Sequence, residues 1–213
     1  MTTFALIHGA GDGGWYWHLV EAELRARGHR TVAPDLPTDP SATLDDFAGV
    51  VLDAVGEVDD GLVVVTQSFG AFTGPLVAAR RPTEQLVIVT GMVPMPGERP
   101  DDWWSATGYA EDLDDDPRVV YYHDVPDHLV DEALARERAH PTEAAGRQPW
   151  PLTSWPDVPT RFVLCTEDRL FPPAFMRRVV RDRLGVVPEE LASGHCAALA
   201  HPRELAALID AEA

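Results

Sequence analysis

The 213-residue chain contains no lysine and no asparagine. Without lysine it can form neither a Schiff base nor a Walker phosphate loop, and without asparagine it has neither an N-glycosylation site nor a Cys-His-Asn triad. Cys165 and Cys196 are its only cysteines, which is too few for a disulfide framework. A bridge between these two is conceivable but not expected in a cytoplasmic protein. Several reaction classes are thereby excluded.

Positive charge is also scarce, because 17 arginines face 35 acidic residues and give a formal net charge of -18. Nucleic acids and anionic membranes are bound by basic faces, so neither is an expected partner. No apolar run reaches the roughly 18 to 20 residues of a membrane span, and the first residues do not resemble a signal peptide. We expect a cytoplasmic, single-domain protein that acts on a small molecule, with a homodimer left open.

One stretch combines a buried strand with a reactive residue. Val63, Val64 and Val65 lead to the sequence Thr66-Gln67-Ser68-Phe69-Gly70, after which an apolar, helix-like segment begins. This order of strand, tight turn and helix is typical of the nucleophile elbow, whose usual pattern is G-x-S-x-G. Thr66 departs from that pattern at its first position. The alternative is that Ser68 only caps a helix after a buried strand.

Strands and helices alternate along the chain. The expected strands are residues 4–7, 31–33, 62–67, 86–89, 161–166 and 186–191, and the expected helices are residues 15–27, 44–58, 69–81, 173–184 and 202–211. Such alternation predicts an α/β fold with a mostly parallel sheet covered by helices on both faces.

The segment 97–157 differs in composition from the rest. It holds 15 acidic residues and five arginines together with seven Trp and Tyr residues. An acidic, aromatic insertion between sheet strands is typical of a cap over an active site, so we predict a hydrolase-like core at 1–96 and 158–213 with a small inserted cap. An equally weighted alternative is a solvated subdomain that its aromatics attach to the core. Predicted substrate contacts are Gly9, Trp103, Trp104, Tyr121 and Tyr122.

Three residues fit a catalytic triad. A serine nucleophile needs a base and an acid, and in α/β-hydrolases they follow in the order Ser, Asp or Glu, His. Ser68, Asp168 and His195 have this order, and each follows a predicted strand. Glu167 is the rival acid, but the shorter Asp168 suits a strand-end loop better. No histidine pair has the spacing of a helical zinc site, so we expect neither metal nor cofactor.

Backbone groups are expected to bind the oxyanion that such a serine creates. The predicted donors are the N–H of Phe69, directly after the nucleophile, and the N–H of Ala10 in the glycine-rich turn after the first strand. His8 is expected to support this turn. A phosphate loop is also rich in glycine, but the spacing here is not the G-x-G-x-x-G of a dinucleotide-binding fold.

Three motifs together resemble the plant hydroxynitrile lyase and methylesterase family of α/β-hydrolases. They are His8-Gly9-Ala10-Gly11-Asp12-Gly13-Gly14-Trp15-Tyr16-Trp17, Cys165-Thr166-Glu167-Asp168 and His195. The resemblance implies the same triad and the same oxyanion donors. The chain departs from the family pattern in three places. It has Thr66-Gln67 where members have Gly-His, its cap is shorter, and it has Cys196 where the cyanogenic lyases carry lysine.

These observations favour a serine esterase for a small apolar or aromatic ester. Two alternatives remain open. The triad could serve as acid-base machinery in a lyase, or in a cyclase or other tailoring enzyme of natural-product synthesis, without an acyl-enzyme. The fold could also be a non-catalytic ligand-binding module, since fold does not determine function.

Overall fold

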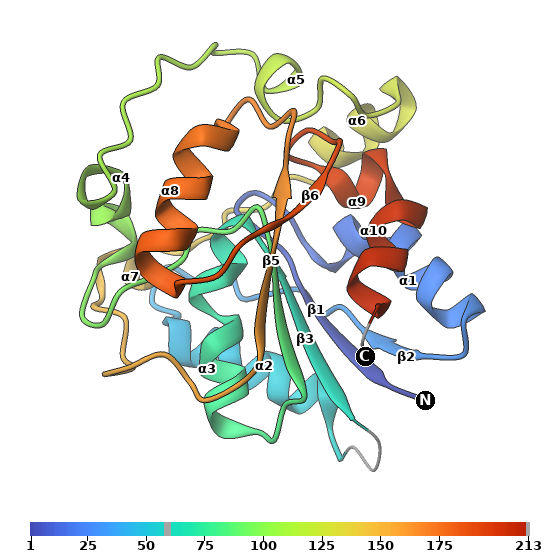
Figure 1. Ribbon diagram of the computed structural model, residues 1–213, viewed down its shortest axis with the longest axis vertical. Coiled ribbons are helices and arrows are strands. Elements are labelled where there is room, and N and C mark those ends of the chain that lie inside the picture. The colour runs from blue at the N-terminus through green and yellow to red at the C-terminus, as the bar shows by residue number, and fades with distance from the viewer. Residues whose placement is uncertain (58–60, 212–213) are drawn as a thin grey trace.

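The computed structural model describes residues 1–57 and 61–211 and shows a six-stranded, fully parallel sheet (Figure 1). Its strands lie in the order β2-β1-β3-β4-β5-β6. They are β1 (Thr3–Ile7), β2 (Arg30–Val32), β3 (Leu62–Gln67), β4 (Gln85–Val89), β5 (Thr160–Cys165) and β6 (Glu189–Leu191). The three strands β1, β3 and β4 are buried throughout, as expected of parallel strands covered on both faces.

Helices cover both faces of this sheet, which confirms the predicted α/β-hydrolase architecture. One apolar cluster joins the sheet to α2 (Leu44–Val55), α3 (Gly74–Arg80) and α8 (Pro173–Leu184). A second cluster joins the other face to α1 (His18–Ala26), α9 (Ala197–Ala200) and α10 (Pro202–Asp210). The alternating valines of β3 supply both clusters, because Val64 points into the first and Val65 into the second.

Helix boundaries differ from the sequence-based expectation where special residues stand. α2 begins at a capping box formed by Thr43 and Asp46 and ends before Gly56, whose φ of 63° few other residues adopt. It was predicted to reach Val58, which lies outside the described residues. The two helices expected at 15–27 and 69–81 each begin as 3-10 turns, at Gly14–Trp17 and Ser68–Phe72.

The part of the segment 97–157 that holds α5 and α6 passes across the top of the molecule in Figure 1, beyond the carboxyl ends of the strands, whereas α4 and α7 lie at the left beside α8. The elements of the whole segment are a 3-10 turn (Pro100–Asp102), α4 (Trp103–Ala106), α5 (Pro117–Val120), α6 (Asp127–Ala135) and α7 (Glu143–Arg147). Two buried indoles attach it to the core: Trp103 Nε1 donates to Val93 O at 3.0 Å, and Trp150 Nε1 donates to Phe72 O at 2.9 Å. The division of the chain into core and cap stays a prediction.

Within the described residues, no helix is both long enough and apolar enough to cross a membrane.

Candidate active site

The turn after β3 holds Ser68 in an unusual backbone conformation. Its φ is 50°, in the left-handed region that residues with a side chain rarely adopt. Gly70 makes this turn possible, because a Cβ at that position would lie 2.8 Å from His8 O and 2.9 Å from Ile7 O of the neighbouring strand. The turn therefore presents Ser68 at the carboxyl end of the sheet, as a nucleophile elbow does.

Thr66 occupies the position where the elbow pattern has glycine, and the structure shows what accommodates it. A Cβ added to Gly74, at the start of α3, would lie 2.2 Å from Thr66 Cγ2. The threonine methyl therefore fills the space that a side chain at position 74 would occupy. The close approach of strand and helix is retained, with the glycine on the helix instead of the strand.

The three predicted triad residues meet at this end of the sheet. His195 Nε2 lies 3.1 Å from Ser68 Oγ, and His195 Nδ1 lies 2.8 Å from Asp168 Oδ2. All three side chains are buried. Because the carboxylate can only accept, Nδ1–H donates to Asp168 and Nε2 is left to accept the serine proton. Glu167, the rival acid, is exposed and makes no side-chain contact with His195 within the described structure.

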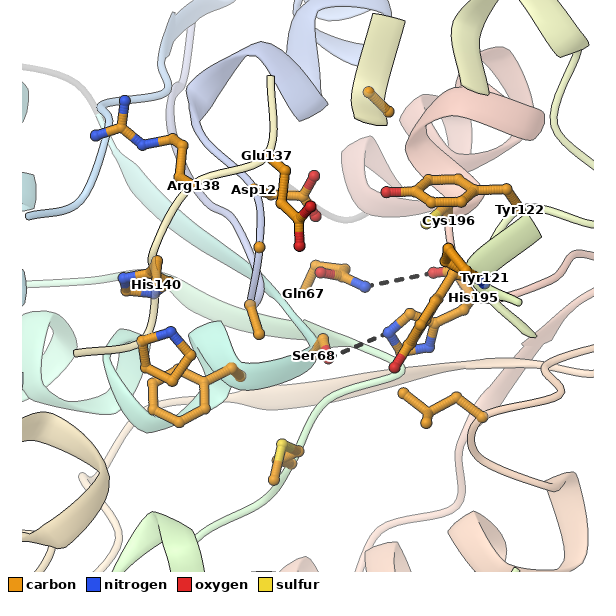
Figure 2. Close-up of a pocket in the computed structure, with 18 of the residues that line it drawn as sticks. Asp12, Gln67, Ser68, Tyr121, Tyr122, Glu137, Arg138, His140, His195 and Cys196 are labelled. Carbon is orange, nitrogen blue, oxygen red and sulfur yellow. Dashed lines mark hydrogen bonds between the residues drawn. The ribbon is translucent and has the colours of Figure 1, made fainter. Parts of the chain in front are cut away.

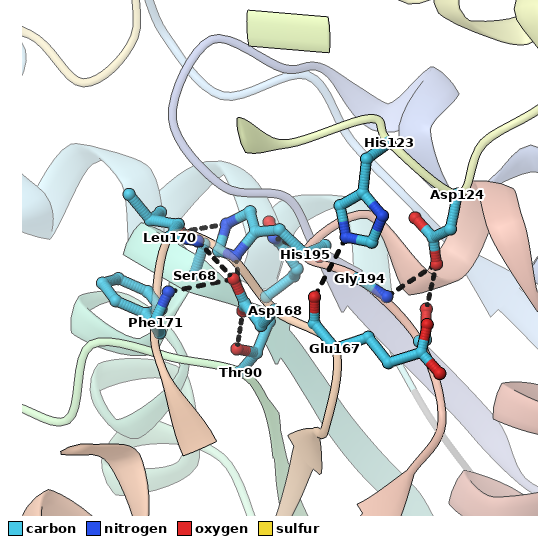
Figure 3. A network of polar contacts seen from close by, with 12 residues as sticks. Ser68, Thr90, His123, Asp124, Glu167, Asp168, Leu170, Phe171, Gly194 and His195 are labelled. Carbon is cyan, nitrogen blue, oxygen red and sulfur yellow. Dashed lines mark hydrogen bonds and ion pairs between the residues drawn. The ribbon is translucent and has the colours of Figure 1, made fainter. Parts of the chain in front are cut away.

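Asp168 is held by three donors besides the histidine (Figure 3). The N–H groups of Leu170 and Phe171 each donate to its Oδ1 at 2.9 Å, and Thr90 Oγ1 donates to its Oδ2 at 2.5 Å. Thr90 follows β4 and has a φ of 38°, a second strained position beside the triad. The donors stabilise the carboxylate form and fix its orientation toward the imidazole.

The segment 97–157 is bonded to the loop that carries His195. Asp124 Oδ2 accepts from the N–H of Gly194 at 2.6 Å and from Ser193 Oγ at 3.1 Å. Next to it, His123 Nε2–H donates to Glu167 O at 3.0 Å, as Figure 3 shows. These bonds connect the segment before α6 to both the acid loop and the histidine loop. His123 thus links the segment 97–157 to the loop that follows β5.

A cavity of about 580 Å³ opens above Ser68 and is walled both by residues of the segment 97–157 and by residues of the rest of the chain (Figure 2). Its wall includes the predicted oxyanion donors and three of the predicted substrate contacts: Ala10, Phe69, Trp104, Tyr121 and Tyr122. The other two predicted substrate contacts, Trp103 and Gly9, do not line the cavity. Trp103 is fully buried against Phe171, and Gly9 lies behind the elbow, where a Cβ would be 2.9 Å from Ser68 Cβ.

Two histidines, His8 and His140, lie beside the glycine-rich turn after β1, which we call the oxyanion turn after its predicted role, and both are uncharged at neutral pH. Burial lowers the pKa of His8 to about 4, and burial together with His8 lowers the pKa of His140 to about 3. His8 supports the turn, as expected, because its Nδ1–H donates to Gly9 O and its Nε2 accepts from the N–H of Leu36. His140 lines the cavity, and its Nε2 is buried without a partner in the described structure.

Sequence reasoning missed five charged or amide side chains of the cavity wall: Asp12, Gln67, Asp101, Glu137 and Arg138. Burial, reinforced by Glu137 and opposed by His195, raises the pKa of Asp12 from its ordinary value of 3.8 to about 7. The signal available in the sequence was a carboxylate two residues after the predicted oxyanion donor Ala10. The glycines around it gave no indication of where its side chain would point.

Cys165 and Cys196 are both free and buried, and burial raises the pKa of each thiol well above its ordinary value. Neither thiol is therefore an activated nucleophile. Among the residues that the structure describes, no three His, Cys, Asp or Glu side chains are grouped so that they could hold a metal ion.

Known proteins resemble this chain in both sequence and fold. A model described as "Alpha/beta hydrolase family" matches residues 4–208. The probable esterase PIR7A of Oryza sativa subsp. indica is 25% identical over 257 aligned residues, covering 97% of this chain and 94% of that protein. Norfluorocurarine synthase 1 of Strychnos sp. is 22% identical over 244 residues, covering 95% and 91%.

Among solved structures, polyneuridine aldehyde esterase has a TM-score of 0.81 at 17% identity, covering 98% of both chains. A pyrethroid hydrolase from Sphingobium faniae has a TM-score of 0.80 at 21% identity, covering 98% of this chain and 95% of that one. At these identities the likeness establishes the fold and leaves the reaction to be argued from the site.

Proposed function

The chain belongs to the alpha/beta hydrolase family, and from that premise we propose that it is a serine hydrolase of carboxylic esters. One observation carries the proposal. A continuous path of hydrogen bonds runs from Ser68 Oγ through the imidazole of His195 to Asp168, at 3.1 and 2.8 Å. Ser68, at one end of this path, lines an open cavity. This is the arrangement that activates a serine hydroxyl for attack on an acyl carbon.

The proposed reaction follows from the roles of these atoms. Ser68 Oγ attacks the acyl carbon while its proton moves to His195 Nε2, and Asp168 stabilises the imidazolium that forms. The N–H groups of Ala10 and Phe69 stabilise the oxyanion. His195 then returns the proton to the alcohol oxygen, the acyl–oxygen bond breaks, and water releases the acid from Ser68 by the same steps.

The substrate is proposed to be a small ester with an apolar or aromatic part. The cavity of about 580 Å³ suits a small molecule, and its wall includes apolar side chains, among them Met92, Leu170 and Phe171. Similar proteins named as esterases support ester hydrolysis.

A second candidate keeps the triad as acid-base machinery without an acyl-enzyme, as in a lyase or a tailoring enzyme. Its support is the similarity to norfluorocurarine synthase 1, together with Asp12, a further carboxyl group in the cavity whose pKa lies near 7. A group with that pKa can exchange protons at neutral pH.

The two candidates are separated by intact-mass spectrometry after incubation with a small fluorophosphonate. Wild type is expected to gain one adduct, and Ser68→Ala none, since only an activated serine reacts. Ser193→Ala, which alters a buried serine two residues before His195, is the matched control and should still be labelled. An unlabelled wild type would overturn the esterase proposal and favour the acid-base candidate.

A further inference from the structure

Three acceptor-bearing side chains gather on one side of the cavity, and we call them the acceptor corner: Asp12, Gln67 and Glu137. They come from the oxyanion turn, the end of β3 and the segment after α6. In Figure 2, Asp12 and Glu137 lie side by side above Gln67, which in turn lies above Ser68. All three line the same cavity as the catalytic serine.

The acceptor corner has no donor within the described structure. The carboxyl groups of Asp12 and Glu137 form neither a hydrogen bond nor an ion pair with any described residue. Gln67 is 1% exposed, and its Nε2 donates to His195 O at 3.4 Å, which fixes the orientation of the amide because a carbonyl can only accept. Its Oε1 is consequently buried without a partner. A buried acceptor without a donor is costly unless a ligand supplies one.

The nearest cationic side chains are engaged elsewhere. Arg138 also lines the cavity, but its guanidinium Nη atoms donate to Asp35 Oδ2 at 3.0 Å and to Leu36 O at 3.3 Å, its buried Nε has no partner among the described residues, and Figure 2 shows the side chain pointing away from Asp12. Arg136 pairs with Glu132 at 3.5 Å and lies over the ring of Trp15. The chain contains no lysine. No arginine of the described structure is therefore bonded to the acceptor corner, which leaves its carboxyl groups open to a cation brought by a ligand.

Resting on the esterase function proposed above, we propose that the acceptor corner binds a protonated amine carried by one arm of the ester. The other arm would lie against the apolar wall at Met92, Leu170 and Phe171. An ammonium group fits because it offers both N–H donors and a positive charge to two carboxyl groups and an amide oxygen.

The ionisation of Asp12 agrees with this geometry. Its pKa of about 7 reflects a carboxylate enclosed by protein beside the negative charge of Glu137, with only His195 acting in the opposite direction. Tyr16, Tyr122 and Cys196 also lie within electrostatic reach of it, and none of them is charged positively. A bound ammonium would stabilise the carboxylate form and lower this pKa.

The test compares ammonium esters with uncharged esters of the same shape. In one pair, dimethylaminoethyl phenylacetate is set against isopentyl phenylacetate, which places the charge in the alcohol arm. In the other pair, benzyl dimethylaminopropanoate is set against benzyl isohexanoate, which places it in the acid arm. The quantity measured is the ratio of kcat/KM within each pair at about pH 8, where Asp12 is ionised.

Wild type is expected to favour the ammonium ester in at least one pair by about tenfold or more, the range that hydrogen bonds to charged groups provide. Asp12→Asn should reduce that ratio by roughly tenfold, and Glu137→Gln, whose side chain is more exposed, by less. Glu132→Gln on α6 is the control, because it removes the same charge from the surface outside the cavity and should leave the ratio unchanged.

Equal or better turnover of the uncharged esters in both pairs would overturn the acceptor corner as an ammonium site while leaving the esterase proposal intact. If no ester is turned over, calorimetric titration with dimethylphenethylamine decides the matter. Binding that weakens about tenfold in Asp12→Asn would support the ammonium site and reject the esterase. Binding that is absent, or equal in both proteins, would reject the site as well.

Discussion

Asp168 and Asp12 are two carboxyl groups of one active site, both close to His195, and their surroundings are opposite in kind. Asp168 accepts four hydrogen bonds, from Thr90, Leu170, Phe171 and His195. Asp12 accepts none from any residue that the structure describes. The contrast separates a carboxylate whose place is fixed before substrate arrives from one whose partner must be brought by the substrate.

The difference in hydrogen-bond donors between the two carboxyl groups affects the stability of the folded protein as well as its proposed function. Donors stabilise a buried carboxylate, whereas an enclosed carboxylate without donors destabilises the folded state whenever it is ionised. The side of the site that performs the proposed chemistry is thus complete within the protein. The side proposed to select the substrate remains incomplete without a ligand.

The largest expected effect on activity comes from removing hydrogen-bond acceptors from Asp168, on the side of the site that is complete within the protein. Asp168→Asn replaces two oxygens that receive four donors with an amide that can accept on only one atom. It no longer holds His195 in the tautomer whose Nε2 is free to accept. We expect kcat to fall by about 10,000-fold, as for the equivalent change in serine proteases.

The measurement is steady-state hydrolysis, together with the rate of fluorophosphonate labelling. Glu167→Gln is the control, because it changes the adjacent exposed carboxyl group and should retain nearly full activity. A loss of comparable size in Glu167→Gln would contradict the assignment of Asp168 as the acid.

A smaller effect is expected from removing one donor of the complete side. Thr90→Val keeps the branched shape at a strained backbone position but removes the hydroxyl that donates to Asp168 Oδ2. We expect kcat to fall roughly tenfold with little change in KM, since one charge-assisted hydrogen bond is lost. Thr166→Val, which removes a hydroxyl from the same sheet edge, is the control. An unchanged kcat in Thr90→Val would show that the remaining three donors suffice.

The smallest effect is a gain of stability on the incomplete side. In the unfolded chain Asp12 ionises near its ordinary pKa of 3.8, whereas in the folded protein it resists ionisation up to about 7. The free energy of unfolding therefore decreases as pH rises between these values, and the penalty is complete above pH 7. Asp12→Asn should raise Tm by about 2 to 4 °C at pH 8, the shift that 1 kcal/mol gives in a chain of this size.

At pH 5 the gain should be less than half as large, because little of the penalty has yet developed. Any Asp→Asn change also relieves the net charge of -18, so Glu132→Gln serves to measure that general contribution. If the gain in Asp12→Asn does not exceed the gain in Glu132→Gln at pH 8, the Asp12 carboxylate carries no special penalty in the folded protein.

The sheet and the meeting of Ser68, Asp168 and His195 could be predicted from the sequence because both depend on local patterns. Buried strands are marked by runs of valine and isoleucine, and parallel strands bring the residues that follow them to one edge. The order of the three residues along the chain then predicted that they form a catalytic triad, without knowledge of the distances between them.

The walls of the cavity could not be predicted in the same way. Trp103 and Trp104 are neighbours of the same type, yet the first is fully buried against Phe171 and the second lines the cavity. Which of two adjacent aromatics faces a ligand depends on how α4 is rotated, and four residues contain no periodicity that would reveal it. Thr90 was missed for a related reason, since its role depends on a backbone angle that the sequence does not mark.

The close contact between Thr66 and Gly74 limits which residues these two positions can hold together. A threonine at position 66 collides with a side chain at position 74, so the threonine requires glycine there. Once both are present, Gly74 can no longer be replaced, although Thr66 still can be. The small residue that lets strand and helix approach closely can thus stand on either side of the contact, but a side chain larger than hydrogen cannot stand on both.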